Sequence, residues 1–229
     1  MVYDQYRHFV RPVRGMFDPA LLRQLRQEYD ALKQDGVAYA GLSEREQRME
    51  SIGATRDSIR MRERWYDIWR GRPGQLEQLR PFTYVTYPLQ IRYLTKAVDI
   101  VPWHQDEGYM KLLPARHTQV ITCWTPLEDR PYECTGLMFA RGHHWPELEH
   151  HGAGPHGACL ADEDFPDFYH ERLELGDCML FGDLVPHKTL MAPHLKTERH
   201  SFEIRLVMPE HALPGKDYFD LETGRFIKT

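Results

Sequence analysis

Several features that would mark other classes of protein are missing from this sequence. Its 229 residues include only four cysteines, which are too far apart to form a CxxC metal or redox motif: Cys123, Cys134, Cys159 and Cys178. No stretch approaches the roughly 18 consecutive apolar residues of a membrane-spanning helix, and the N-terminal stretch has no apolar core like that of a signal peptide. The wide spacing of the cysteines favours free thiols in a reducing compartment. Together with the lack of long apolar runs, it leads us to expect a soluble, cytoplasmic protein that does not enter membranes.

Excess charge, internal repeats and flexible linkers are also absent. The net charge is -5 and the pI is about 6.2, so nothing favours nucleic acid or an anionic membrane as a partner. No Gly/Ser-rich or Pro-rich segment divides the chain, and its length suits one large domain better than two. We therefore expect a single domain over residues 1–229 that acts on a small-molecule substrate. The sequence leaves the oligomeric state open.

Residues 1–80 have a mostly helical pattern. Asp18 suits a helix N-cap and Pro19 the first helical position; an apolar stripe follows, and Gly36 ends it: Leu21, Leu22, Leu25, Tyr29 and Leu32. A further helix is predicted around Ile59, Trp65, Ile68 and Trp69, bounded by Gly71 and Pro73. The arginines in this segment form either a solvated helix face or an anion-binding patch near a site: Arg56, Arg60, Arg62 and Arg64.

The pattern changes to short strands after Pro81. Runs rich in β-branched and aromatic residues, separated by Pro, Gly and Asp, predict strands at 83–87, 90–95, 117–124, 136–140, 178–181 and 201–208. Many short strands without long helices between them indicate an antiparallel sandwich or jelly roll over residues 81–208. Residues 209–229 would then form a C-terminal tail that acts as a lid or a packing strap.

The sequence Trp103-His104-Gln105-Asp106 is the first candidate for a site. In an extended strand, His104 and Asp106 project from the same face, because side chains two residues apart point the same way. An imidazole beside a carboxylate supplies two of the three ligands in the 2-His-1-carboxylate sites of non-haem iron enzymes. By itself the pattern is weak, since His-x-Asp often consists of two solvated polar residues.

The third ligand has to come from one of many histidines. Leu175-Gly176-Asp177 predicts a turn, and the buried strand after it ends at Pro186-His187, where a barrel strand would reach its cavity. A rival assignment pairs His194 with Arg205, but His194 follows Pro193 in a loop. We therefore favour His187.

The strand after this loop carries an unusual charged face. By the period of two, Arg199, Ser201, Glu203 and Arg205 share one side of the strand, and the other side is mainly apolar. Inward charge is costly unless it is paired. A guanidinium with a hydroxyl two residues further on can bind a carboxylate, because the arginine forks onto both oxygens and the serine adds a donor.

The order of these motifs resembles the phytanoyl-CoA dioxygenase family. The resemblance runs from about residue 90 to residue 205 and rests on Trp-His-Gln-Asp, a Trp-x-x-Leu-Glu-Asp strand, Gly-Asp, the distal histidine and Arg-x-Ser. It implies a double-stranded β-helix (jelly roll) that binds Fe(II), 2-oxoglutarate and O2, and most often hydroxylates a C–H bond. By this resemblance His104, Asp106 and His187 would bind iron, and Arg199 with Ser201 would hold the distal carboxylate of 2-oxoglutarate.

The chain departs from the family at two places. Arg141-Gly142-His143-His144 replaces the usual Pro-Gly-Ser-His, and Lys188-Thr189 follows the distal histidine. Neither change removes a ligand, but both could reshape the mouth of the site. The retained Asp106 favours hydroxylation, desaturation or cyclisation over halogenation, since halogenases of this kind have a small residue there.

Other residues are secondary candidates. Thr118, Trp124 and Tyr93 are on strands that would flank the metal, where they could contact 2-oxoglutarate or simply fill the core. Just beyond the ligands, Glu107, Tyr109 and Met110 are candidates for substrate contact. A histidine-rich stretch reads as a solvated loop over the mouth of the site: His143, His144, His150, His151 and His156.

Two other functional classes stay open. A cupin-like isomerase or a sugar-binding jelly roll would use the metal ligands without oxygen chemistry, and a degenerate binding protein would have lost turnover. The first class has no reason for an inward Arg-x-Ser, and the presence of all three ligands and the arginine argues against the second.

Overall fold

The computed structural model describes residues 4–34, 57–60, 63–69, 73–86, 90–94, 100–111, 120–154, 157–161 and 164–229. None of the helices in these ranges is long and apolar enough to cross a membrane.

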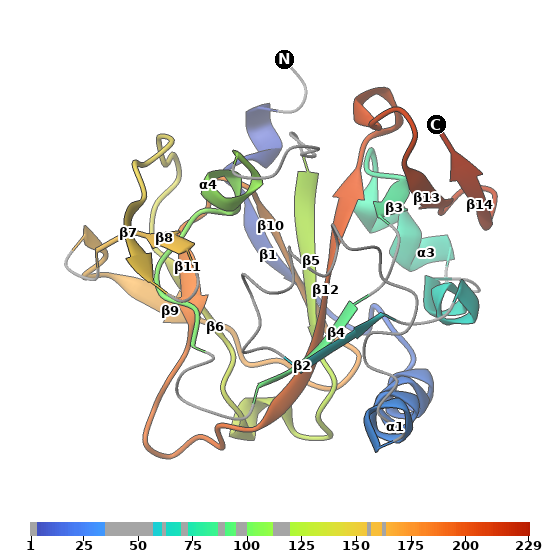
Figure 1. Cartoon of the computed structure of the whole chain (residues 1–229), viewed down its shortest axis with the longest axis horizontal. Coiled ribbons are helices and arrows are strands. Elements are labelled where there is room, and N and C mark those ends of the chain that lie inside the picture. The colour runs from blue at the N-terminus through green and yellow to red at the C-terminus, as the bar shows by residue number, and fades with distance from the viewer. Residues whose placement is uncertain are drawn as a thin grey trace.

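A nine-stranded antiparallel sheet forms the larger part of the structure (Figure 1). Its main path runs β1-β10-β5-β12-β3-β13-β14, with β4 added to β12 and β2 added to β4. The bounds are β1 Val10–Val13, β2 Asp57–Arg60, β3 Tyr84–Thr86, β4 Gln90–Leu94, β5 Val120–Pro126, β10 Cys178–Gly182, β12 Arg199–Val207, β13 Asp217–Asp220 and β14 Arg225–Lys228. The long strand β12 pairs with β5, while its first half also pairs with β4 and its end with β3.

A smaller sheet lies beside the large one and closes the barrel (Figure 1). It has the order β11-β6-β9, with β6 at Leu137–Ala140, β9 at Phe168–His170 and β11 at His187–Thr189; β7 (His151–Gly154) and β8 (Gly157–Cys159) form a separate pair. One buried apolar cluster joins Trp124, Met179 and Phe181 of the large sheet to Phe139 of the small sheet. Two sheets that share such an interior form a double-stranded β-helix, which confirms the predicted fold class.

Helix α1 (Pro19–Gln34) covers the outer face of the large sheet. The Asp18 carboxylate accepts a hydrogen bond from the backbone N–H of Ala20 at 2.7 Å, as expected of an N-cap. The helix buries Leu22, Leu25 and Tyr29 in one cluster with the outward-facing residues of β5 and β12. The predicted helix is therefore confirmed, while its expected end at Gly36 lies outside the described residues.

The remaining helical elements are short. They are η1 Asp4–Tyr6, η2 Glu63–Trp69, α3 Pro73–Leu76, η3 Glu77–Leu79, α4 Asp106–Lys111, η5 Pro131–Glu133 and η7 Pro209–His211. The second predicted helix was wrong around Ile59, which lies in β2, whereas Trp65, Ile68 and Trp69 are buried in η2. A single apolar pattern thus covers a strand and a 3-10 helix, because short apolar runs do not distinguish the two.

Residues 209–229 differ from the expected tail. After η7 they form the hairpin β13-β14, and β13 pairs with β3 at the edge of the large sheet. Tyr218 and Phe219 are buried there. The hairpin covers a strand edge whose N–H and C=O groups would otherwise be unpaired.

The N-terminal residues 6–9 pack directly on Gly182 of β10. Gly182 donates its N–H to the Phe9 carbonyl at 2.9 Å, and a Cβ at this glycine would clash with the backbone oxygens of Tyr6 and Arg7. Position 182 therefore has no room for any side chain.

Substituting Gly182→Ala should destabilise the protein by about 2 kcal/mol or more, because backbone atoms rather than a flexible side chain must move. Urea unfolding followed by fluorescence measures the change. Gly74→Ala is the matched control, since a Cβ there meets nothing within 4 Å and the residue lies in a helix. Equal stability of the two variants would contradict the close approach.

Candidate metal centre

Three buried side chains from distant parts of the chain converge at one end of the barrel. The Nε2 atoms of His104 and His187 lie 3.9 Å and 4.0 Å from Oδ1 of Asp106. Among the residues that the structure describes, these three form the one group of His, Cys, Asp and Glu side chains arranged to hold a metal ion. The structure thus brings together the three residues predicted as ligands.

The backbone of the two histidines is fixed by a reciprocal pair of hydrogen bonds. The His104 N–H donates to the His187 carbonyl and the His187 N–H donates to the His104 carbonyl, both at 3.0 Å. Each ring is then oriented by its own Nδ1–H, which donates to a nearby carbonyl, of Pro102 for His104 and of Val185 for His187, at 2.8 Å and 2.9 Å. Because Nδ1 carries the proton, Nε2 keeps its lone pair for a cation.

Asp106 is held in a different way from the one predicted. No strand runs through residues 104–106, because His104 makes an isolated β-bridge to His187 and Asp106 is the first residue of α4. Between the two ligands, the Gln105 side chain turns away: its amide donates to the Leu184 and Pro146 carbonyls at 2.7 Å and 2.8 Å. His104 and Asp106 still share one side, so the expected pairing is correct although its local structure is not.

Both oxygens of Asp106 have protein donors. The Thr122 hydroxyl donates to Oδ2 at 2.5 Å, and Nη2 of Arg205 lies 3.2 Å from Oδ1. Oδ1 is also the oxygen that faces the two imidazoles. Two neutral imidazoles and one carboxylate oxygen suit Fe(II), and their arrangement on one side of the ion leaves other coordination positions open.

Arg205 belongs to a row of alternating charges along the inner wall. Its Nη1 lies 2.7 Å from Glu203, and Glu203 lies 3.7 Å from Nη1 of Arg92. Burial would raise the pKa of Glu203, but Arg205 and Arg92 outweigh it and hold this pKa far below its usual value. Burial likewise lowers the pKa of Arg205, and Asp106 and Glu203 raise it above its usual value. Glu203 and Arg205 are therefore both charged.

Arg199 points into the barrel from the start of β12. It is only 6% exposed, its Nη1 donates to the Gly136 carbonyl at 2.7 Å, and its guanidinium carbon lies 5.0 Å from the centre of the Trp124 ring. Trp124 belongs to the same apolar cluster as Phe181, whose ring centre is 4.5 Å from that of His187. Ser201 is buried two residues further along the same strand face. Arg199, Ser201 and Trp124 therefore share one interior with the histidine.

Tyr93 does not join this group. It lies next to Arg92 on β4, so its side chain points to the outer face, where its ring stacks on His200 at 4.2 Å. His200 lies on the opposite face of β12 from Arg199 and Ser201, by the alternation of side chains along a strand. The structure thus separates Tyr93 from the other predicted 2-oxoglutarate contacts; Thr118 lies outside the described residues.

The other candidates have mixed positions. Glu107 is buried, 3.9 Å from Nη2 of Arg7, and Arg7 also binds both oxygens of Asp183 at 3.1 Å and 3.2 Å. Tyr109 and Met110 are in α4, but their side chains are outside the described part of the structure, as are those of Arg56, Arg60, Arg62 and Arg64. His194 is exposed, which separates the rival ligand from the cluster.

The histidine-rich stretch is not simply solvated. His143 and His144 are exposed, but Nε2 of His150 accepts a hydrogen bond from the Gln105 N–H at 2.9 Å. A Cβ at Gly108 would clash with the His150 ring. The prediction of a solvated loop was therefore wrong for His150, which braces the segment that carries the ligands; His156 lies outside the described residues.

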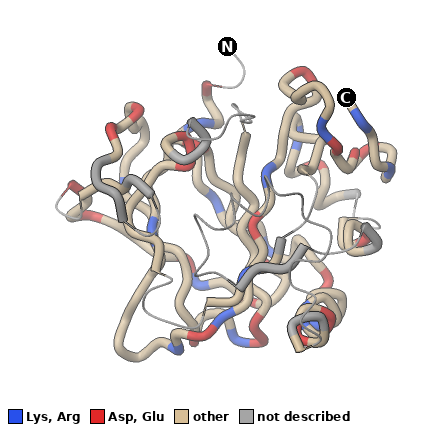
Figure 2. Tube along the Cα trace, viewed as in Figure 1, with Lys and Arg blue, Asp and Glu red and all other residues tan. Residues whose placement is uncertain are grey.

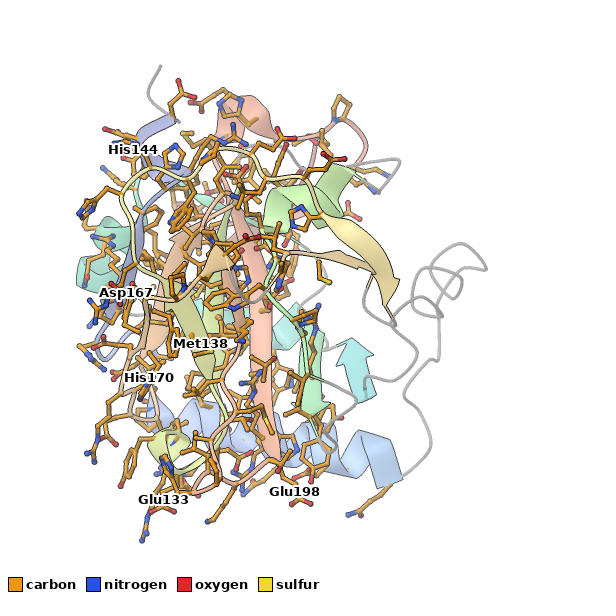
Figure 3. All side chains as sticks on the ribbon, turned by 90° about the vertical axis from the view of Figure 1, so that its left-hand side faces the viewer. Glu133, Met138, His144, Asp167, His170 and Glu198 are labelled. Atoms are coloured by element: carbon orange, nitrogen blue, oxygen red, sulfur yellow. The ribbon has the colours of Figure 1, made fainter. Side chains whose placement is uncertain are left out.

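The two cavities described lie away from the three ligands. A polar one of about 750 Å³ includes Glu133 and Glu198, which Figure 3 shows at the barrel end covered by α1, whereas His144 is at the opposite end. A smaller one of about 260 Å³ has Trp124 and Met179 in its lining together with the exposed residues Arg172 and His194, so it opens to the surface beside the tryptophan that contacts Arg199.

Of three charged residues on the inner wall, Arg92 and Glu203 were not predicted as part of the site, and Arg205 was considered only in the rival assignment with His194. Arg92, Glu203 and Arg205 form ion pairs that end on Asp106. The period-two pattern had already placed Glu203 and Arg205 on the face of Arg199. Since inward charges must be paired, that pattern contained the signal for a charged row.

Comparisons with known proteins agree with this geometry. The phytanoyl-CoA dioxygenase (PhyH) family matches residues 10–191. No curated protein matches the chain in sequence.

Several solved structures share the fold at low sequence identity. The epimerase SnoN from nogalamycin biosynthesis, in complex with Fe3+, alpha ketoglutarate and nogalamycin RO, has a TM-score of 0.58 and 18% identity over 90% of this chain and 80% of its own. The non-heme monooxygenase ThoJ gives 0.61 and 18% over 91% and 78%. EctD from S. alaskensis, with 2-oxoglutarate and 5-hydroxyectoine, gives 0.54 and 12% over 97% and 79%. At these identities the likeness shows the fold.

The lowered pKa of Glu203 predicts a specific acid sensitivity. The unfolded chain takes up a proton at Glu203 near pH 4.5, whereas the folded protein resists it, so the free energy of unfolding falls as the pH drops below about 4.5. One such group contributes a slope of up to about 1.4 kcal/mol per pH unit. Glu203→Gln should therefore flatten the dependence of stability on pH between about pH 5 and pH 3, measured by urea unfolding. Identical slopes for the two proteins would contradict the assignment.

Proposed function

Because the chain belongs to the phytanoyl-CoA dioxygenase family, we propose that it is a non-haem Fe(II) and 2-oxoglutarate-dependent oxygenase. In this proposal it hydroxylates a C–H bond of a small-molecule metabolite and releases succinate and CO2. The observation that carries it is the convergence of His104, Asp106 and His187 in an interior that also contains the buried Arg199.

The three converging side chains would hold the iron. The imidazoles offer Nε2, and Asp106 offers Oδ1 while Thr122 occupies Oδ2, which favours one carboxylate oxygen as ligand. Bound iron and 2-oxoglutarate supply the oxygen activation and C–H cleavage. The chain's part is to fix the ligands, exclude water through the apolar cluster around Trp124 and Phe181, and orient the two substrates.

Arg199, Ser201 and Trp124 would bind the distal carboxylate of 2-oxoglutarate. Of the described residues on the inner wall, Arg92, Arg199 and Arg205 are cationic, and Asp106 and Glu203 are anionic, so the wall has a net charge of about +1 at neutral pH. A divalent ion would raise this to about +3. A dianion such as 2-oxoglutarate compensates most of that charge, whereas a neutral ligand would not.

Hydroxylation is the reaction we favour. The carboxylate of Asp106 occupies the position where a halogenase needs a small residue, so chloride has no place on the ion. The similar structures include an epimerase and a monooxygenase, and the structure of EctD contains 5-hydroxyectoine.

Glu107, Tyr109 and Met110 are the proposed substrate contacts, because they lie in α4, the helix that begins with the ligand Asp106.

The free thiols of all four cysteines support the predicted reducing, cytoplasmic setting.

A redox-silent jelly roll is the alternative function. It would need the three metal ligands but gives no reason for the buried Arg199 and Ser201 on the inner face of β12. Oxygen-dependent succinate release separates the two.

His187→Ala should abolish both signs of the proposed activity. Wild-type protein with Fe(II) and 2-oxoglutarate under anaerobic conditions should develop a weak visible charge-transfer band, and oxygen should then release succinate even without a substrate. The variant should show neither, because one ligand is missing. His194→Ala is the matched control and should keep both, since His194 is exposed in a loop. A His187→Ala variant with wild-type succinate release would overturn the ligand assignment.

Arg199→Lys should raise the KM for 2-oxoglutarate by about tenfold or more, because lysine keeps the charge and loses the two-pronged contact. The kcat for succinate release should change much less, since the iron ligands are intact. Arg23→Lys is a suitable control, because Arg23 binds Asp129 in an exposed ion pair. An unchanged KM in the Arg199 variant would remove this residue from the cosubstrate site.

A further inference from the structure

A second carboxylate lies on the inner wall beyond Arg205 and outside the group of three ligands. Glu203 follows the inward alternation of β12, between Ser201 and Arg205, and its backbone pairs with that of Trp124. Its carboxylate is therefore separated from the metal-facing oxygen of Asp106 by one guanidinium, that of Arg205.

Arg205 is bound to both carboxylates. Its Nη1 lies 2.7 Å from Glu203, and its Nη2 lies 3.2 Å from Oδ1 of Asp106. One guanidinium thus occupies the space between the metal-facing oxygen of the triad and the additional acid. Arg92 also contacts Glu203, at 3.7 Å, but of these two arginines Arg205 is the one with an ion pair to Asp106 among the described residues.

The placement matters because an ionised carboxylate is a good ligand for a divalent cation. On an octahedral ion, three protein ligands leave three positions open. A fourth protein ligand would leave two open positions. A keto acid that chelates the ion would use both of them, so no position would remain for O2. The proposed function, on which this inference rests, therefore requires that Glu203 stay off the metal.

We propose that Arg205 is a positioning residue that holds Glu203 away from the iron and so keeps the number of protein ligands at three. It acts through Glu203, whose carboxylate it binds and neutralises. This role differs from ordinary support of a ligand, because it predicts that loss of Arg205 strengthens metal binding.

The test is a titration of purified protein with Co(II), followed by the visible spectrum of the bound ion and then by addition of 2-oxoglutarate. In Arg205→Met, Glu203 is released and becomes a fourth ligand, so Co(II) should bind about tenfold more tightly and 2-oxoglutarate about tenfold more weakly than in the wild type. The Co(II) spectrum should also change before any 2-oxoglutarate is added. Arg205→Gln is the second variant, chosen because it keeps a hydrogen-bond donor in the wall; it should shift both affinities in the same directions.

Arg92→Met separates coordination from charge, because it removes one cation from the same wall while Arg205 still holds Glu203, so its Co(II) spectrum should match that of the wild type. The double variant Glu203→Gln, Arg205→Met tests the role of the carboxylate. It lacks the cation but also lacks the carboxylate, so its Co(II) spectrum and both affinities should return close to those of the wild type. Arg23→Met controls for the loss of an arginine elsewhere.

Two results would overturn the inference while leaving the oxygenase proposal intact. One is a Co(II) affinity in Arg205→Met that falls by about 10- to 100-fold, as expected when an ordinary orienting partner is removed. The other is a Co(II) affinity and spectrum that change equally in Arg92→Met and Arg205→Met, which would show an effect of charge alone. A wild-type protein that binds neither Co(II) nor 2-oxoglutarate would overturn both proposals.

Discussion

The site depends on the two backbone hydrogen bonds that join His104 to His187. They fix the separation of two segments that lie far apart in the chain, and each imidazole is then oriented by a carbonyl two residues before it. Gln105 and His150 hold the first segment from outside, while Phe139 and Phe181 pack around the second histidine. The ligand geometry is therefore set mainly by backbone contacts and packing, and the ion has only to complete it.

Charge inside the barrel obeys a second constraint. Arg92, Glu203, Arg205 and Asp106 alternate in sign, so each of these four charges has an opposite neighbour within 4 Å. Buried pairs of this kind contribute little net stability compared with apolar packing, but removal of one member leaves an uncompensated charge. Outside the barrel the charged residues of both signs are spread along the described trace (Figure 2). The ordered alternation is thus a property of the interior, where the dielectric is low.

Much of the architecture could be predicted from sequence because it follows local patterns. The period of 3.6 found α1, and the period of two found β12 and its inward face, including Arg199 and Ser201. Elements whose stability comes from distant partners were missed, such as β1, which pairs with β10, and the hairpin β13-β14, which pairs with β3. Likewise the strand of Tyr93 was identified, and its side chain was expected to flank the metal inside the barrel. The side that it faces depends on the register between β4 and β12, which places its ring on His200 at the outer face. The charged row was visible as a pattern, while its connection to Asp106 required the register of β12 against β5.

The pairing of distant segments, which brings His104 next to His187, also bears on the order in which the site can form during synthesis. The strand that precedes His187 pairs with the N-terminal strand β1, and β5 pairs with β12 near the end of the chain. Such non-local pairing forms slowly compared with helical contacts. A chain synthesised only as far as β10 would lack the His187 imidazole and the β12 members of the charged wall, Glu203 and Arg205. The group of three ligands is complete only once His187 is present, so such a chain has no assembled centre for a metal ion.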